Sequence, residues 1–272
     1  MKIDYNLQFN ENNKLQHFLN IENLSKEHIN EIIDLADSYI NNDSNKFKDL
    51  EGKTIASLFF EPSTRTKTTF ELASKRLSAD FINIDIANSS TLKGESILDM
   101  IKTLEAMECD MFIVRHSSSG TPHYIAKEVG KKISVINAGD GIHAHPTQAM
   151  LDMYTIKKYK GSFENLNVSI VGDILHSRVA KSLIASLKIL SVKNINIIGP
   201  KNLMPENINK LGINYFSNLE KGINNVDVII MLRLQQERMK EAFISTEDYY
   251  NNYGLTKQKI MSAKKDVIVM HP

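Results

Sequence analysis

A short polar segment, Ser63-Thr64-Arg65-Thr66, combines residue types that suit anion chemistry. It follows an apolar run, 53–60, and Pro62, and it precedes residues with helical spacing. A serine in that position predicts a helix N-cap. Free backbone N–H groups and the positive end of the helix dipole make a helix N-terminus an anion site. The hydroxyls add donors and Arg65 adds a planar guanidinium suited to phosphate, although a plain cap beside a solvated arginine explains the segment equally well.

Other basic and polar side chains follow the ends of further apolar runs. These side chains are Ser89 to Lys93, Arg115, His145, Arg178 and Arg233. In open α/β sheets, ligands bind beyond the carboxyl ends of the strands. Because the whole chain carries a formal charge of only +1, cations gathered at these places predict one or two small ligands with several negative charges.

The sequence also offers a possible metal site and a possible dinucleotide site. His143 and His145 form an H-x-H pair with His116 and His123 nearby in the sequence, but no carboxylate or cysteine spacing supports a metal. The segment VSIVGD, followed by a helix and a strand, suggests a dinucleotide fold. However, Asp173 follows Gly172 directly, and the G-x-G-x-x-G pattern is absent. We therefore expect neither a metal nor a cofactor.

Short β-branched runs alternate with helical patterns along the chain. A first helix is expected near Ser25–Ile40, with Ser25 as its cap. Nine runs predict strands: 53–60, 81–86, 111–114, 133–137, 167–172, 194–199, 213–216, 226–231 and 266–270. Helical spacing recurs at Phe70/Ala73/Leu77, Ile97/Met100/Ile101/Leu104 and Val179/Leu183/Leu187/Leu190. This alternation predicts an α/β fold with parallel sheets covered on both faces.

The length of 272 residues suggests two domains, at roughly 100–200 residues each. A helix over 146–160, with a proline in its first turn, separates the two sets of strands. We expect two doubly wound parallel-sheet domains, 1–145 and 146–272, joined by that linking helix.

Composition excludes several classes of protein. The chain is 42% hydrophobic and 24% charged, as is usual for a folded globular protein, and Lys+Arg 33 against Asp+Glu 32 gives no bulk charge for nucleic acid or membrane. No apolar stretch approaches the roughly 18 residues of a membrane span. The first residues lack the apolar core of a secretory signal. One cysteine, Cys109, excludes a disulfide framework, and its acidic neighbours oppose a thiolate nucleophile. A cytoplasmic protein is expected.

Six polar segments stand in order along the chain: FFEPSTRTKTTFE, SSTLKGES, VRHSSSG, HAHPTQAMLD, VGDILHSR and MLRLQQER. Together they resemble the motifs of aspartate carbamoyltransferase catalytic chains, in the aspartate/ornithine carbamoyltransferase family. The resemblance runs from about residue 50 to the end, and less distinctly through the amino-terminal helix. It implies transfer of the carbamoyl group of carbamoyl phosphate to the amine of L-aspartate, giving N-carbamoyl-L-aspartate and phosphate. This is an early step of de novo pyrimidine biosynthesis.

The resemblance also implies roles for individual residues in binding carbamoyl phosphate. The phosphate of carbamoyl phosphate is assigned to Ser63, Thr64, Arg65 and Thr66. Thr66, Arg115 and His145 are the expected catalytic residues, because they resemble those that hold the carbamoyl oxygen. Gln148 is assigned to the carbamoyl amide. Positioned donors stabilise the charge that develops on that oxygen during amine attack.

For aspartate, the resemblance assigns the α-carboxylate to Arg178 and the side-chain carboxylate to Arg233 and Gln235. Arginine pairs well with carboxylates, so two guanidinium groups select a dicarboxylate. Lys93, with Ser89 or Ser90, resembles residues that enter the site of a neighbouring subunit. A homotrimer with shared active sites is therefore expected, and regulatory chains are left open.

Two rival readings remain beside this one. Ornithine carbamoyltransferases share the S-T-R-T and H-P-x-Q logic, but Arg233 would repel a cationic substrate, and the S-M-G and H-C-L-P motifs of that family are missing. The second rival is a binding-only scaffold. It arises because the chain ends at His271-Pro272, where the family continues through a loop and a helix, so a C-terminally truncated chain is expected. Such a scaffold would keep phosphate affinity through Ser63–Thr66 without turnover.

Overall fold

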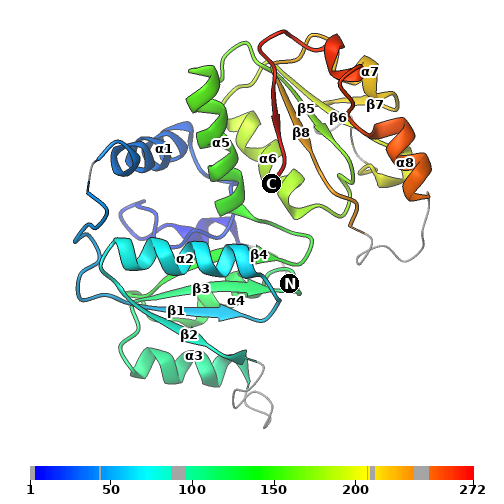
Figure 1. The fold of residues 1–272 in the computed structure, drawn as a ribbon. Helices are drawn as coiled ribbons and strands as arrows, with labels where there is room; N and C mark the ends of the chain where they lie inside the picture. Colours follow the sequence, from blue (N-terminus) through cyan, green and yellow to red (C-terminus); the bar gives the residue numbers. More distant parts are fainter. Residues whose placement is uncertain (1–3, 43, 87–95, 207, 209–211, 236–244) are drawn as a thin grey trace. The chain divides into compact units, whose positions relative to one another are not determined.

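The structure is a computed structural model of the chain, and it describes residues 4–42, 44–86, 96–206, 208, 212–235 and 245–272. Two compact units divide the chain: Met1–Asn23 with Glu31–Thr147, and Leu24–Asn30 with Gln148–Pro272. Each unit holds one parallel sheet with helices packed on it (Figure 1). The predicted α/β fold with two parallel-sheet domains is confirmed. The predicted domain boundary between residues 145 and 146 stays a prediction, whereas the two compact units meet between Thr147 and Gln148.

The first unit contains a four-stranded parallel sheet of order β2-β1-β3-β4. Its strands are β1 (Thr54–Phe59), β2 (Asp80–Ile84), β3 (Met111–His116) and β4 (Ser134–Asp140). Its helices are α2 (Thr64–Arg76), α3 (Ile97–Ala106) and α4 (Thr121–Glu128). Right-handed crossovers place α2 and α3 on opposite faces, because the chain reverses direction across the sheet after β2 (Figure 1). The central strands β1 and β3 are covered on both sides, which explains their near-continuous apolar runs.

The second unit contains a five-stranded parallel sheet of order β7-β6-β5-β8-β9. Its strands are β5 (Asn167–Val171), β6 (Asn194–Ile198), β7 (Asn214–Phe216), β8 (Val228–Met231) and β9 (Ile268–Met270). Its helices are α6 (Arg178–Ile189), α7 (Leu219–Gly222) and α8 (Thr246–Tyr253). All nine predicted strands are therefore present, with ends that differ by a few residues.

The remaining helices follow local signals in the sequence. Among the described residues they are α1 (Lys26–Ile40), α5 (Pro146–Lys160) and the short 3-10 helices η1 (Tyr5–Gln8), η4 (Lys201–Leu203) and η7 (Lys259–Ser262). Ser25 caps α1 as predicted, because its hydroxyl accepts a hydrogen bond from the backbone N–H of His28 at 3.2 Å. The helix α5 begins at the proline that marks its first turn.

One predicted apolar face is wrong in detail. In α2, Ala73 is exposed and Ser74 is buried instead. Ser74 tolerates burial because its hydroxyl donates to the carbonyl of Phe70 at 2.8 Å, which satisfies the polar group. The spacing of Ile97, Met100, Ile101 and Leu104 is correct for α3, whose last three apolar positions are buried.

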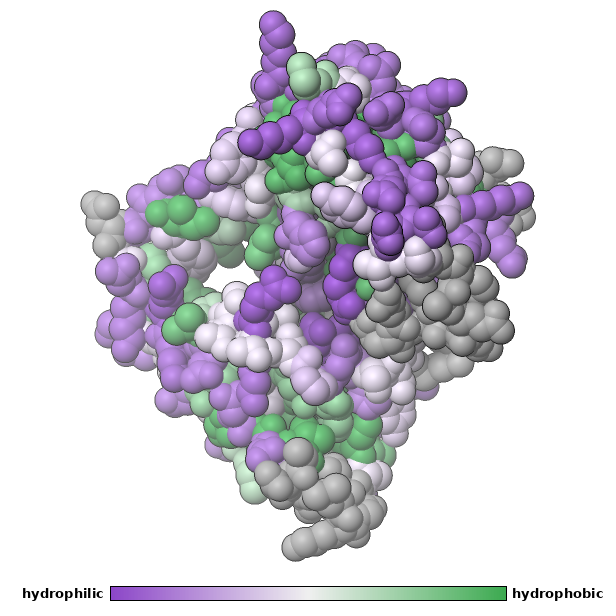
Figure 2. Space-filling view, turned by 45° about the vertical axis from the view of Figure 1, so that its right-hand side comes forward, coloured by the Kyte–Doolittle hydropathy of each residue, from purple (hydrophilic) through white to green (hydrophobic). Residues whose placement is uncertain are grey.

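Hydrophilic side chains cover most of the face shown in Figure 2, and hydrophobic side chains form small scattered groups on it. Within the described ranges, no helix is long and apolar enough to cross a membrane.

Candidate active site

The turn between β1 and α2 carries the predicted anion site. Ser63 occupies the N-cap position in extended backbone, with φ −163° and ψ 96°, and its carbonyl accepts from the N–H of Lys67 at 3.2 Å. Its hydroxyl makes no capping hydrogen bond to the described helix, so the predicted side-chain cap is wrong. The extended backbone of Ser63 therefore starts the helix without using its hydroxyl. Free N–H groups at a helix N-terminus are typical of anion-binding sites, so the prediction of an anion site at this turn stands.

Arg115 reaches the same edge of the sheet through strand pairing. In the parallel register of β1 and β3, Arg115 lies beside Phe59, four residues before Ser63. Its guanidinium donates to the carbonyl of Ala138 at 3.3 Å and lies 3.4 Å from a carboxylate oxygen of Glu61. These two contacts come from β4 and from the β1–α2 turn, so they fix the guanidinium at the carboxyl ends of three strands.

His145 follows β4 at the end of a tight turn. The backbone of Asp140 and Ala144 forms an antiparallel bridge across that turn, which leads directly into α5. His145 is buried, and its Nδ1 lies 3.4 Å from the hydroxyl of Thr147. The predicted residues Ser63–Thr66, Arg115 and His145 thus stand at the carboxyl ends of β1, β3 and β4 in one unit.

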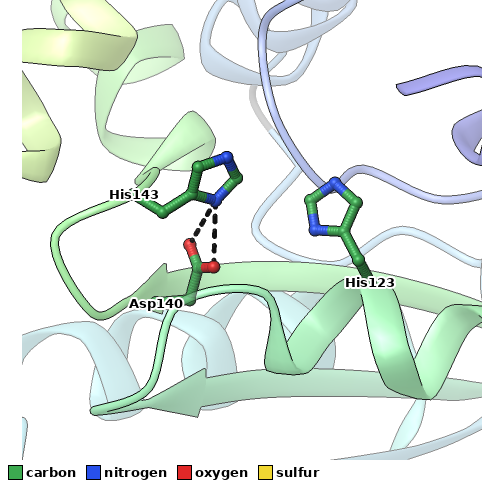
Figure 3. Close-up of side chains that lie close together, drawn as sticks. All are labelled: His123, Asp140 and His143. Atoms are coloured by element: carbon green, nitrogen blue, oxygen red, sulfur yellow. Dashed lines mark hydrogen bonds and ion pairs between the residues drawn. The ribbon is translucent and has the colours of Figure 1, made fainter. Parts of the chain in front are cut away.

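Asp140 organises this turn and was not singled out from the sequence. Its carboxylate is fully buried, with 0% of the residue exposed, and accepts from the N–H of Gly120 at 2.6 Å and of Ala144 at 3.1 Å. It also accepts from Asn137 Nδ2 at 2.8 Å and lies 3.0 Å from Nδ1 of His143 (Figure 3). Burial alone would raise the pKa of Asp140, but its hydrogen bonds and the charge of His143 hold that pKa below its usual range. The D-x-x-H spacing was the available signal.

Gln148 lies in the first turn of α5 and is held by a carboxylate. Its Nε2 donates to Oδ1 of Asp152 at 3.1 Å, one helical turn further on. Asp152 is 2% exposed, and its Oδ2 has no hydrogen-bond partner among the described residues. Burial raises the pKa of Asp152 to about 7. The sequence analysis assigned a role to Gln148 but did not identify Asp152, the buried carboxylate that accepts its hydrogen bond.

Arg178 begins α6 in the second unit, just beyond β5. It is only 4% exposed, and Ser177 caps the helix by accepting from the N–H of Ala180 at 3.1 Å. Asp173, on the same connection, is buried and accepts from the N–H of His176 at 3.1 Å. A buried guanidinium at this place provides a strong and permanent positive charge.

The segment after β8 lies against the end of β5. Gly172 has φ +134°, and a Cβ on it would lie 2.8 Å from the carbonyl oxygen of Leu232, so this close approach requires glycine. The backbone N–H of Gln235 also faces the carboxylate of Asp173 at 3.4 Å. Gln235 is buried, whereas Arg233 is exposed, and its Nη1 donates to the carbonyl of Leu234 at 3.4 Å.

Lys93, Ser89 and Ser90 fall outside the described residues. Cys109 is buried. Burial raises the pKa of its thiol, and the negative charge of Asp110 raises it further. A thiol with a raised pKa is a poor nucleophile, in agreement with the expectation from the sequence.

Two parallel-sheet units, each with cationic and hydrogen-bonding side chains at the carboxyl ends of its strands, define a two-domain α/β protein that binds small anionic molecules. The model of the aspartate/ornithine carbamoyltransferase carbamoyl-phosphate-binding domain matches residues 16–158. The model of the aspartate/ornithine-binding domain of the same family matches residues 164–272. The chain therefore belongs to the aspartate/ornithine carbamoyltransferase family.

Solved structures of aspartate transcarbamoylases are similar to the chain. The enzyme from Trypanosoma cruzi in complex with carbamoyl aspartate and phosphate has a TM-score of 0.85 at 29% identity, over 94% of this chain and 84% of that one. The same enzyme with N-(phosphonacetyl)-L-aspartic acid has a TM-score of 0.85 at 29% identity, over 98% and 87%. The catalytic subunit from M. jannaschii has a TM-score of 0.81 at 32% identity, over 95% and 86%.

Proposed function

We propose that the chain is an aspartate carbamoyltransferase, which transfers the carbamoyl group of carbamoyl phosphate to the amine of L-aspartate. The observation that carries this proposal is the similarity, over 94% of the chain, to an aspartate transcarbamoylase solved with carbamoyl aspartate and phosphate. The products are N-carbamoyl-L-aspartate and phosphate, and the reaction belongs to pyrimidine biosynthesis.

The first unit binds carbamoyl phosphate in this proposal. Its phosphate sits at the N-terminus of α2, where Ser63, Thr64, Arg65 and Thr66 supply hydroxyls, N–H groups and a guanidinium. The uncapped state of Ser63 supports this role, because a ligand then replaces the missing cap. Gln148, which is the first residue of α5 that belongs to the second unit and is held by Asp152 at 3.1 Å, is assigned to the carbamoyl amide by the family resemblance.

The chemical step follows from the placement of donors. The aspartate amine attacks the carbonyl carbon, a C–N bond forms, and the bond from that carbon to the phosphate oxygen breaks. Negative charge builds on the carbonyl oxygen, which Thr66, Arg115 and His145 stabilise as hydrogen-bond donors. The amine loses a proton, and the departing phosphate is the proposed acceptor. Positioning and charge stabilisation carry this mechanism, without a covalent enzyme intermediate.

The second unit binds aspartate. Arg178 takes the α-carboxylate, while Arg233 and Gln235 take the side-chain carboxylate. The burial of Arg178 supports this role, since a guanidinium out of water pairs strongly with a carboxylate. An ornithine side chain is cationic, and Arg233 would repel it.

The proposal extends to the assembly and the location of the protein. A homotrimer, with Lys93 of each chain entering a neighbouring site, follows from the family resemblance of that lysine. Light scattering coupled to size-exclusion chromatography tests the trimer directly. A cytoplasmic location is part of the same proposal.

The deciding experiment measures ureido-product formation by the purified chain from carbamoyl phosphate, with aspartate and ornithine in parallel reactions. Product that depends on aspartate is expected. Product that depends on ornithine would overturn the assignment of Arg178 and Arg233. Absence of product with either substrate, in a protein that still binds phosphate, would favour the binding-only scaffold.

A further inference from the structure

Three side chains in the first unit converge beside the turn that follows β4. His123 comes from α4, Asp140 ends β4, and His143 lies in the turn (Figure 3). Each offers one nitrogen or oxygen atom, and these atoms all lie within 4.8 Å of one another. None of the three has a role in the proposed carbamoyl transfer. The register of β3 and β4 creates this group, because it pairs His116 with Asp140 and so sets Asp140 beside the connection that leads into α4.

The spacing suits one metal ion. A tetrahedral zinc ion binds nitrogen and oxygen at about 2.0–2.2 Å, which holds its ligand atoms roughly 3.3–3.5 Å apart. Nδ1 of His143 and Oδ2 of Asp140 already lie 3.0 Å apart. The ligand atom of His123 lies within 4.8 Å of the other two ligand atoms. A shift of the His123 side chain by roughly 1.5 Å would bring it to the separation that a zinc ion requires.

The donor types also suit a metal, because the group combines two imidazoles with a buried carboxylate. Two imidazoles and one carboxylate favour Zn²⁺ or a similar transition metal over Mg²⁺ or Ca²⁺.

A second layer of hydrogen bonds supports the ligands, as in known metal sites. Asn20 Nδ2 lies 2.9 Å from Nε2 of His123, which leaves Nδ1 as the ring nitrogen that faces Asp140. Rotation of the Asn20 amide by half a turn lets its oxygen accept a proton from Nε2, which frees the lone pair of Nδ1. That rotation gives up the 3.4 Å contact from Gln8 Nε2 to the Asn20 oxygen and turns the Asn20 NH2 group toward Gln8. The N–H of Gly120 and Nδ2 of Asn137 orient the Asp140 carboxylate.

We propose that His123, Asp140 and His143 bind one divalent transition-metal ion, with Zn²⁺ as the preferred ion, and that this ion braces the turn 140–145. The ion binds Nδ1 of His143 and replaces the contact between that atom and the Asp140 carboxylate. The adjacent Ile142 is 42% exposed, so the turn is accessible from outside. The inference does not depend on the proposed transferase activity.

Calorimetric titration of the untagged, chelator-treated full chain with Zn²⁺, and with Mg²⁺ for comparison, tests this site. We expect one Zn²⁺ per chain, a rise in the thermal unfolding temperature on binding, and no comparable effect of Mg²⁺. The His123→Gln and His143→Gln variants should each lose at least ~10-fold in Zn²⁺ affinity. Loss of a residue that only hydrogen-bonds to a metal ligand already costs about that much, and a lost ligand should cost no less. Bound Co²⁺ should give a visible absorption band that both variants lose.

His176→Gln is the matched control. His176 pairs with Asp173 at 3.0 Å with the same spacing of three residues, but no third ligand joins that pair in the described part of the chain. Its Zn²⁺ affinity should equal that of the unchanged chain. The proposal fails if the unchanged chain binds no Zn²⁺, or if the three variants bind it equally. If one histidine variant does not fold, the other decides.

Discussion

At the scale of single residues, Arg115 shows how a side chain becomes a positioned donor. Contacts to the carbonyl of Ala138 and to the carboxylate of Glu61 hold the planar guanidinium at the strand ends. The proposed oxyanion needs a donor whose direction is set before the reaction begins. A flexible ammonium group does not provide this.

We therefore expect Arg115→Lys to lower kcat by roughly 10²–10³-fold, the usual cost of removing one oxyanion donor. Steady-state kinetics of ureido-product formation measure the effect. Arg76→Lys, at the exposed end of α2, is the control and should leave kcat unchanged. An Arg115→Lys enzyme with normal kcat would remove Arg115 from the chemical step.

Asp152 gives a second prediction for a single residue. Its folded pKa is raised from 3.8 to about 7, so between these values the folded state holds a proton that the unfolded state has lost. Stability should therefore fall as pH rises through this window, by on the order of 4 kcal/mol. Asp152→Asn keeps an oxygen for Gln148 and does not ionise.

Urea unfolding of the Asp152→Asn variant across this pH window measures the contribution. The variant should lose the fall and be more stable than the unchanged chain above about pH 7. Equal pH profiles for the two proteins would show that Asp152 keeps an ordinary pKa.

At the scale of elements, residues 17–19 of the amino-terminal segment hydrogen-bond along β4. Phe18 bridges to Ile136 in parallel fashion, and Asn137 Nδ2 donates to the carbonyl of Leu19 at 2.8 Å. Nδ1 of His17 accepts from the N–H of Val135 at 3.1 Å. Only a neutral His17 accepts this bond, and burial lowers its pKa to about 4. The segment thus depends on an uncharged imidazole.

The stability contributed by neutral His17 is fully present above its unfolded pKa of 6.5 and is lost as pH falls toward about 4. The loss amounts to at most about 3 kcal/mol. His17→Asn, whose amide oxygen replaces Nδ1 as acceptor, should reduce this acid destabilisation. His123 titrates in the same range, so some of the slope should remain. Chemical unfolding at about pH 5 and about pH 7 checks this, and an unchanged slope would contradict it.

At the scale of the whole molecule, the two units divide the substrates between them in the proposed function. A ligand that binds only the folded state at 100 times its Kd stabilises that state by about 2.7 kcal/mol. Carbamoyl phosphate should act through the first unit, which carries Ser63–Thr66, and aspartate through the second, which carries Arg178.

Arg178→Gln should therefore keep the thermal shift caused by carbamoyl phosphate and lose the further shift caused by aspartate. Thermal unfolding with each ligand alone and with both measures this. The exposed Lys188→Gln, at the far end of α6, serves as the control and should keep both shifts. A loss of the carbamoyl phosphate shift in Arg178→Gln would contradict the division.

Much of this protein was determined by the sequence itself. The β-branched runs located all nine strands, and Pro146 marked the start of α5, because local apolar patterns and proline geometry act over a few residues. The polar residues at the strand ends were also recognisable, since parallel strands send their carboxyl ends to one edge of a sheet.

Only the tertiary structure decided which polar groups meet. Asp173 faces the backbone of Gln235, 62 positions away along the chain, and His123 comes to Asp140 and His143 only through the register of β3 and β4. Such contacts depend on strand order, register and side-chain burial over long separations, and no local pattern of residues encodes them.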